Sequence, residues 1–262
     1  MQAPEADLAL LCDAVQDAGE IAMRYWRHKP EHWGKPDNGG PVSEADLAVN
    51  ERLDSLLRGA RPGYGWLSEE SSDTTDRLSA PRCFIVDPID GTRGFINGED
   101  TFSIVAGIAE GGRMIAGAVW LPALKRLYSA HSDGPALYNG TPVRASDTTD
   151  PHGARVLTTA PNMAASHWPG GVPDLKRSFR PSLAYRMCLV AEGRHDAMIT
   201  FRPAWEWDIA AASLIAERGG ARVTDARGGP LRFNCPDPRA NGVIAAPPAL
   251  HSALMARALA PS

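Results

Sequence analysis

The stretch Phe84–Ile96, with the sequence FIVDPIDGTRGFI, constrains this chain more than any other segment. It begins as an apolar run and turns polar at Asp87. We expect Pro88 to end the strand, because proline has no N–H to donate to a neighbouring strand. Asp87 and Asp90 can hold a hard divalent cation, and the free N–H groups of a helix starting after Asp90 can receive an anion. A cation site and an anion site within one turn indicate phosphate chemistry.

Three further acidic residues lie near expected element ends, and each also has a purely structural interpretation. Asp46 forms a capping box with Ser43 at the start of a helix. Glu70, next to Glu69, is typical of a solvated surface, and Asp208 is typical of a helix N-cap. Brought together with the two aspartates above, these carboxylates would repel one another unless cations neutralised them. Hard oxygen ligands without convergent Cys or His favour Mg²⁺ over zinc.

The pattern of apolar residues predicts a layered α+β or α/β chain with a boundary near residue 145. In residues 1–145 we expect two amphipathic helices, a mobile loop at 31–41 between them, and then several mostly antiparallel strands. In residues 146–262 strands and helices alternate, which predicts a mixed sheet sandwiched by helices.

Composition excludes several classes of function. The formal net charge of −4 leaves no basic surface for a nucleic-acid polymer. The four cysteines are far apart, so neither a zinc ribbon nor a disulfide framework is indicated, which fits a reducing cytoplasm. The N-terminal segment lacks the basic start and apolar block of a signal peptide, and no apolar run approaches the ~18 to 20 residues of a membrane span. We therefore expect a cytoplasmic protein with no membrane partner.

Other phosphate-handling and nucleophile motifs are absent from the sequence. It contains no G-x-x-x-x-G-K-[ST], no G-x-G-x-x-G after an expected strand, and no G-x-S-x-G. Without a nucleophilic side chain, water activated by a metal is the expected nucleophile.

Four motifs occur in order over almost the whole chain: Pro41-Val-Ser-Glu-Ala-Asp46, Ser68-Glu-Glu-Ser71, Asp87-Pro-Ile-Asp-Gly-Thr92, and Trp207-Asp-Ile-Ala-Ala-Ala212 followed by Gly219-Gly220. They resemble those of the inositol monophosphatase superfamily, the lithium-sensitive, Mg²⁺-dependent phosphomonoesterases. Ser68 and Ala212 stand where this superfamily usually has glycine. The resemblance implies an αβαβα sandwich of the sugar-phosphatase kind, phosphoric monoester hydrolase activity and a small phosphorylated substrate. Related enzymes are often dimers, so a homodimer is a further expectation.

The resemblance also implies a set of metal ligands for two or three Mg²⁺ ions. Glu70 and Asp87 would share one ion with the backbone carbonyl of Ile89. Asp87, Asp90 and Asp208 would hold a second ion. A third and weaker ion would lie near Glu70 through water.

Roles at the phosphate follow from the same resemblance. Gly91 and Thr92 would offer backbone N–H groups to the phosphate, and Thr92 its hydroxyl as well, with Asp208 also beside the substrate. Thr92 paired with Asp46 would orient and deprotonate the attacking water next to Glu70. The catalytic set is therefore Asp46, Glu70 and Thr92.

Residues outside the signature aspartates are expected to decide the substrate. Inositol-specific members carry a glutamate seven residues before the second-signature aspartate, where this chain has Phe201. The segments 91–95, 206–208 and 229–234 instead resemble the 3′(2′),5′-bisphosphate nucleotidases. The loop around Lys35 also matches one that those enzymes place over the metals.

We therefore expect removal of the 3′-phosphate from 3′-phosphoadenosine 5′-phosphate. Inositol-1-monophosphatase activity is the second expectation and histidinol-phosphate phosphatase the third. An inactive metal-binding regulatory module is the alternative from a different class of function.

Overall fold

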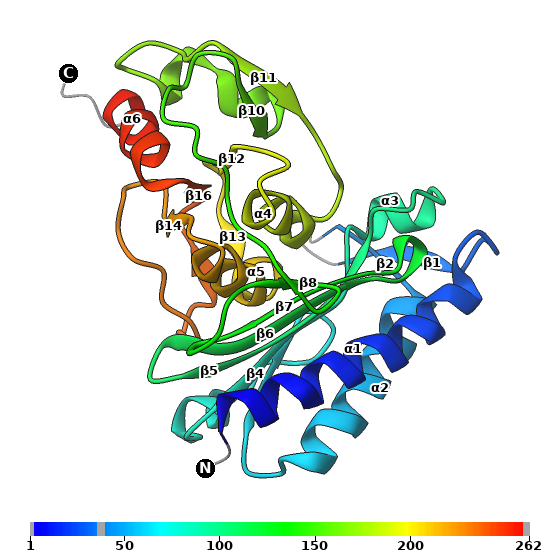
Figure 1. Ribbon diagram of the computed structural model, residues 1–262. Helices are drawn as coiled ribbons and strands as arrows, with labels where there is room; N and C mark the ends of the chain where they lie inside the picture. The colour runs from blue at the N-terminus through cyan, green and yellow to red at the C-terminus, as the bar shows by residue number, and fades with distance from the viewer. Residues whose placement is uncertain (1–2, 36–39, 259–262) are drawn as a thin grey trace.

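The computed structural model describes residues 3–35 and 40–258 of the chain, which Figure 1 shows as layers of helices and sheets. The α-helices are α1 (Pro4–Tyr25), α2 (Glu44–Ala60), α3 (Thr92–Ile96), α4 (Leu183–Ala191), α5 (Glu206–Arg218) and α6 (Pro248–Ala258). The strands are β1 (His32–Gly34), β2 (Pro41–Ser43), β3 (Gly65–Ser68), β4 (Cys83–Asp90), β5 (Ser103–Glu110), β6 (Arg113–Leu121), β7 (Arg126–His131), β8 (Leu137–Tyr138), β9 (Thr141–Pro142), β10 (Ala154–Leu157), β11 (Leu175–Ser178), β12 (Ala197–Thr200), β13 (Ala204–Trp205), β14 (Arg222–Thr224), β15 (Arg239–Ala240) and β16 (Val243–Ala246).

Two main sheets carry the fold. The larger sheet has the strand order β3-β4-β5-β6-β7-β8-β9 and is antiparallel except where β3 runs parallel to β4. The smaller sheet has the order β11-β10-β12-β16-β14 and mixes parallel with antiparallel pairs. Both patterns agree with those expected before and after residue 145, while the division into two domains there stays a prediction.

Helices cover both faces of the larger sheet (Figure 1). On one face α1 and α2 pack against strands that include β4 and β6, and on the other face α5 packs against the same two strands beside α4. On their other side α4 and α5 contact the smaller sheet, and α6 contacts β16 from its far face. The layers are therefore helix, sheet, helix, sheet and helix, which confirms the expected αβαβα sandwich.

The strand β4 leads into the signature motif and runs further than expected. It is buried along its whole length, which explains its continuous apolar run. The expectation that Pro88 ends this strand is wrong, because pairing with β5 continues until Asp90 lies opposite Ser103. The register shifts between Asp87 and Asp90, so a β-bulge accommodates the proline at a position where no ladder hydrogen bond is required.

The predicted loop at residues 31–41 has a more regular base than expected. Residues of β1 pair with β2 in an antiparallel register that sets Trp33 opposite Val42. The N–H of Lys35 donates to the carbonyl of Gly40, at 2.8 Å, and extends this pairing. The tip of the predicted flap, residues 36–39, lies outside the described residues.

The helix α1 shows how the outer helices attach to the larger sheet. Its buried residues Leu11, Val15 and Ala18 recur at helical spacing and form one apolar face. Gly19 allows close approach to β6, because a Cβ atom added there would lie 2.5 Å from the ring of Trp120. No helix in residues 3–35 and 40–258 combines the length and apolar character needed to cross a membrane.

Candidate metal and phosphate site

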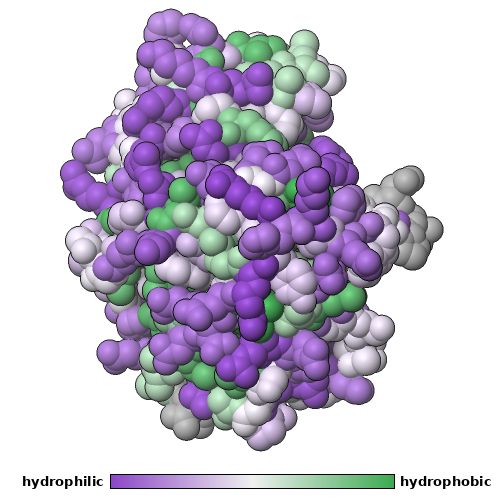
Figure 2. Space-filling view, turned by 90° about the vertical axis from the view of Figure 1, so that its right-hand side faces the viewer, coloured by the Kyte–Doolittle hydropathy of each residue, from purple (hydrophilic) through white to green (hydrophobic). Residues whose placement is uncertain are grey.

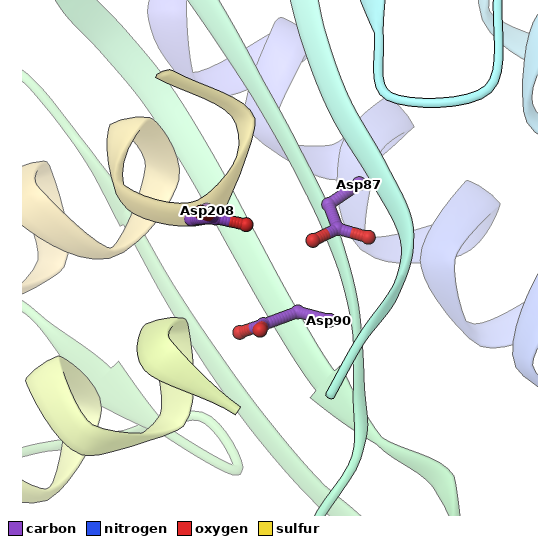
Figure 3. A group of neighbouring side chains, drawn as sticks. All are labelled: Asp87, Asp90 and Asp208. Atoms are coloured by element: carbon purple, nitrogen blue, oxygen red, sulfur yellow. The ribbon is translucent and has the colours of Figure 1, made fainter. Parts of the chain in front are cut away.

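Three aspartates from two elements converge on one point (Figure 3). Asp87 and Asp90 come from the end of β4, and Asp208 comes from the first turn of α5. Each offers a carboxylate oxygen, and these oxygens lie within 4.8 Å of one another. Three hard oxygen ligands so placed suit a divalent cation such as Mg²⁺.

The electrostatics of this triad also suit a cation. Burial raises the pKa of Asp87 and of Asp208 well above their usual values, and neighbouring carboxylates raise both further. Asp87 Oδ2 is buried and accepts no hydrogen bond from any described residue. Such an oxygen costs free energy unless a group outside the protein chain satisfies it. A divalent cation would satisfy it and offset the repulsion among the carboxylates.

The carboxylate of Asp90 is held by the N-terminus of α4. Its Oδ2 accepts hydrogen bonds from Ser182 Oγ at 2.6 Å and from the N–H of Ala184 at 2.7 Å. Its Oδ1 accepts one from the N–H of Leu183 at 3.1 Å. Burial raises the pKa of Asp90 to about 6, and these hydrogen bonds act in the opposite direction. The orientation of Asp90 is thus fixed by residues 92 to 94 positions away in the sequence.

The turn after β4 places Thr92 between two acceptors. Gly91 has a φ of +95°, and a Cβ atom there would lie 3.0 Å from the backbone nitrogen of Ser182, so both conformation and space favour glycine. Thr92 Oγ1 lies 3.2 Å from Asp46 Oδ1 and 3.0 Å from the carbonyl oxygen of Ile89. The contact between Thr92 and Asp46 that the resemblance implied is therefore present. Phosphate binding by Gly91 and Thr92 stays a prediction.

Each carboxylate oxygen of Asp46 has a separate contact. Oδ2 accepts hydrogen bonds from the N–H of Ser43 at 2.9 Å and from Ser43 Oγ at 2.6 Å, which anchors the start of α2. Oδ1 remains directed at Thr92. Burial raises the pKa of Asp46 to about 6, an effect that the bonds from Ser43 oppose. The capping interpretation and the functional interpretation are thus compatible, since capping fixes the oxygen that faces Thr92.

Glu69, to which the sequence analysis gave no role, lies beside the triad. β3 and β4 are in register as far as Ser68 and Val86, and the N–H of Glu69 donates to the carbonyl of Val86 at 3.3 Å. This pairing sets Glu69 next to Asp87. The charge of Glu69 raises the pKa of Asp46, Asp87 and Asp208. Its side chain lines the adjoining cavity. The register of β3 is the signal that could have identified Glu69, whereas metal binding by Glu70 stays a prediction.

Lys35 brings the base of the predicted flap to the two glutamates. Its Nζ lies 2.6 Å from Glu69 Oε1 and 2.6 Å from Glu70 Oε1. Burial acts to lower the pKa of Lys35, but the two carboxylates raise it above its usual value. Burial raises the pKa of Glu70 to about 7, and Lys35 opposes that shift.

A cavity of about 610 Å³ adjoins the triad. One part of its wall carries the residues described above, namely Glu69, Asp90, Gly91, Thr92 and Asp208. The rest comes mainly from loops and element ends in residues 159–205. Figure 2 shows the face of the molecule on the side of α3 and the β1–β2 hairpin, where hydrophilic residues predominate and hydrophobic ones are scattered. A polar cavity with an acidic centre suits a small charged substrate that binds together with cations.

Comparison with known proteins decides the family. The sequence profile described as the inositol monophosphatase family matches residues 4–261. The chain belongs to the inositol monophosphatase family. This confirms the resemblance that the four motifs indicated, and the fold agrees with it as well.

Relatives within the inositol monophosphatase family carry different substrate names at equal similarity. Inositol-1-monophosphatase of Mesorhizobium japonicum is 29% identical over 231 residues, which cover 80% of this chain and 84% of that protein. The 3′(2′),5′-bisphosphate nucleotidase CysQ of Salmonella typhimurium is 29% identical over 239 residues, which cover 86% and 93%. Both hydrolyse phosphate monoesters, so the predicted phosphoric monoester hydrolase is confirmed as the class of enzyme.

A solved structure supports the fold independently. The extragenic suppressor protein suhB of Bartonella henselae superposes with a TM-score of 0.81 at 25% identity, over 97% of this chain and 98% of that one. The layered arrangement of sheets and helices is therefore the inositol monophosphatase fold.

Proposed function

We propose that the chain is a Mg²⁺-dependent phosphomonoesterase that hydrolyses a small phosphate ester with two or three bound ions. The observation that supports this most is the convergence of Asp87, Asp90 and Asp208 beside the turn at Gly91 and Thr92. When bound, Mg²⁺ supplies positive charge that stabilises the phosphoryl oxygens and lowers the pKa of an attacking water.

Two further ligands would complete the metal set. The carbonyl of Ile89 lies within the same turn, as its contact with Thr92 shows. For the glutamate we favour Glu69 over Glu70, because Glu69 lines the cavity and acts electrostatically on the triad. Both glutamates share Lys35, so substitution of either one changes the same ion-pair cluster and allows a matched comparison.

Thr92 and Asp46 would prepare the attacking water. When Thr92 donates its proton to Asp46 Oδ1, the lone pairs of Thr92 Oγ1 are free to accept a proton from water. As the water attacks, its proton moves to Thr92 Oγ1 and the proton of Thr92 moves to Asp46. The bonds from Ser43 keep Asp46 in the direction that this transfer needs.

For the substrate we favour 3′-phosphoadenosine 5′-phosphate. At the position where inositol-specific enzymes carry a glutamate, Phe201 stacks on His167 with ring centroids 4.6 Å apart and meets Trp168 edge-on at 5.3 Å. Phe201 is therefore engaged in packing and offers no acceptor for inositol hydroxyls. The similarity to the CysQ nucleotidase, at 29% identity, is compatible with this choice. Inositol-1-monophosphatase is the second candidate, because a relative with that name is equally identical to this chain.

Phosphate release in the presence of Mg²⁺ tests these candidates directly. The purified protein is given 3′-phosphoadenosine 5′-phosphate, inositol 1-phosphate or histidinol phosphate in parallel. We expect the highest kcat/KM for the adenosine bisphosphate. A higher kcat/KM for inositol 1-phosphate would replace the nucleotidase assignment by the second candidate.

The Asp90→Asn variant serves as the inactive reference in the same assay. A kcat of the unaltered protein that matches this variant on all three substrates would favour the regulatory module that binds metal without catalysis. Any Mg²⁺-dependent release above the variant supports the phosphatase.

A further inference from the structure

Part of the cavity wall is basic, and its arginines form no ion pair with a carboxylate in the part of the chain that the structure describes. Arg93, Arg186 and Arg202 line the cavity together with the acidic centre. Among residues 3–35 and 40–258, none of the three forms an ion pair with a carboxylate. Arg93 follows Thr92 directly, and its guanidinium approaches the base of the flap at Gly40. Arg186 and Arg202 come instead from α4 and from the segment after β12.

Arg186 is a buried cation whose position is fixed without a carboxylate. Only 8% of its surface is exposed. Its Nε donates to the carbonyl of Arg180, and its Nη2 donates to the carbonyl of Pro181 at 3.0 Å. Its Cζ lies over the ring of Phe179, 4.4 Å from the ring centroid. A guanidinium has five N–H donors, so three remain for a ligand in the cavity.

The cost of burying Arg186 indicates that an anion completes its surroundings. Burial lowers the pKa of Arg186, and the charges of Asp90 and Asp208 only partly oppose this shift. A buried charge without an adjacent counter-ion is expensive, whereas a fixed guanidinium binds a phosphate group in a planar, two-bonded geometry. The triad is occupied in the proposed function by cations, so it does not serve as the counter-ion of Arg186.

Arg202 adds a second and more exposed positive charge to the cavity wall. The chain leaves β12 at Thr200, and the next side chain, Phe201, turns into the aromatic contacts with His167 and Trp168. Arg202 lines the cavity and makes no side-chain hydrogen bond to any described residue. A neutral polyol such as inositol would leave both guanidinium groups without a partner.

We propose that Arg186 and Arg202 bind a second phosphate group carried by the leaving-group part of the substrate. This inference rests on the proposed phosphatase function and specifies its substrate class as a phosphate monoester that bears another phosphate. The reacting phosphate lies at the acidic centre and at Gly91 and Thr92, while the second phosphate lies against the two arginines. The two residues therefore determine specificity and take no part in the transfer of the proton or the phosphoryl group.

Two substrates that differ by one phosphate test the proposal. Adenosine 3′,5′-bisphosphate and adenosine 3′-monophosphate present the same reacting phosphate and the same base, and only the first carries the 5′-phosphate. We expect the unaltered protein to show a kcat/KM at least about tenfold higher on the bisphosphate, as one charge-assisted contact allows. Equal values of kcat/KM on the two substrates would overturn the proposal.

Variants at the two arginines assign the effect to residues. Arg202→Gln is the primary variant, because its exposed side chain carries little risk for folding. It should lower kcat/KM about tenfold on the bisphosphate and less than about twofold on the monophosphate. Arg186→Gln should show the same selectivity with a larger loss, and Arg186→Lys should recover part of it by restoring the charge. Arg177→Gln, an exposed arginine of β11, is the matched control and should change neither value.

The outcomes separate this inference from the proposed function. Equal losses on both substrates would mean that the arginines act on the reacting phosphate or on folding, and would overturn the second-phosphate site alone. Absence of Mg²⁺-dependent phosphate release from every substrate would instead overturn the phosphatase assignment itself.

Discussion

The acidic and basic parts of the cavity wall are built in different ways. The acidic part comes from Glu69 after β3, the end of β4 and the start of α5, and the carboxylate of Asp90 is oriented by hydrogen bonds. The basic part comes from α3, from α4 and from the segment after β12, and its Arg202 is exposed. The first construction suits a reaction step common to all substrates, because its geometry is fixed in advance. The second suits discrimination between leaving groups, because it can change without moving the reacting atoms.

Asp87→Asn should have the largest effect and should not distinguish between substrates. Loss of this ligand is expected to lower kcat by about 10²- to 10³-fold or more on each phosphate ester, measured by phosphate release. Because burial and neighbouring carboxylates already disfavour the Asp87 charge, the unfolding temperature of the metal-free variant should be unchanged or higher. Asp147→Asn, whose side chain is 86% exposed, is the control. Loss of activity on one substrate only would contradict the idea that the acidic part of the wall serves a reaction step common to all substrates.

Glu69→Gln and Glu70→Gln should differ by a smaller factor that identifies the glutamate at the metal. Both variants keep the side-chain shape and both weaken the cluster around Lys35. We expect Glu69→Gln to cost about 10- to 100-fold in activity or in apparent Mg²⁺ affinity, and Glu70→Gln to cost clearly less. Titration of activity with Mg²⁺ measures both quantities. A larger cost for Glu70→Gln would restore the assignment that the family resemblance implied.

The effect of pH on the stability of the metal-free protein should be smaller than the effects of the Asp87 and glutamate variants. The pKa of Asp46 and of Asp90 is about 6 in the folded protein, against an ordinary value of 3.8. Between these values the folded state binds more protons than the unfolded state, so stability falls as pH rises. The contribution of these groups is fully present below about pH 4 and is lost through about pH 6 in the metal-free protein.

Saturating Mg²⁺ should reverse this loss above pH 7. Binding at about 100 times the dissociation constant adds about 2.7 kcal/mol, or roughly 5 to 10 °C in unfolding temperature for a chain of this size. Thermal melts at pH 5 and pH 7.5, with EDTA or with Mg²⁺, measure both effects. A Mg²⁺ shift that is as large in Asp87→Asn as in the unaltered protein would show that the triad does not hold the ion.

The sequence pointed to part of the acidic centre because some of its pieces are local, whereas site roles for Asp46 and Asp208 came from the family resemblance. Asp87 through Thr92 form one bulge and one helix start, and Ser43 with Asp46 form a cap whose hydrogen bonds span three residues. Such contacts depend on neighbours in the chain and can be inferred from residue type and spacing. The layered fold followed from the same kind of local pattern together with the family resemblance.

Contacts between distant residues account for what the sequence did not reveal. The bulge at Pro88 depends on how β4 pairs with β5, so the proline by itself could not show that the strand continues. The position of Glu69 depends on the register between β3 and β4. Likewise, Arg186 and Arg202 reach one cavity because of how α4 and β12 pack. Their separation in the sequence does not predict that they meet there.

The start of α4 has a consequence for how such an enzyme could diversify. Residues 182–184 hold Asp90, and Arg186 belongs to the same helix only two positions further on. Evolution or directed mutagenesis at residue 186 therefore risks disturbing a carboxylate that we propose binds metal, together with the substrate preference. Arg202 is joined to no such support among the described residues, which makes it the position where a new preference can be selected at the lowest cost to turnover.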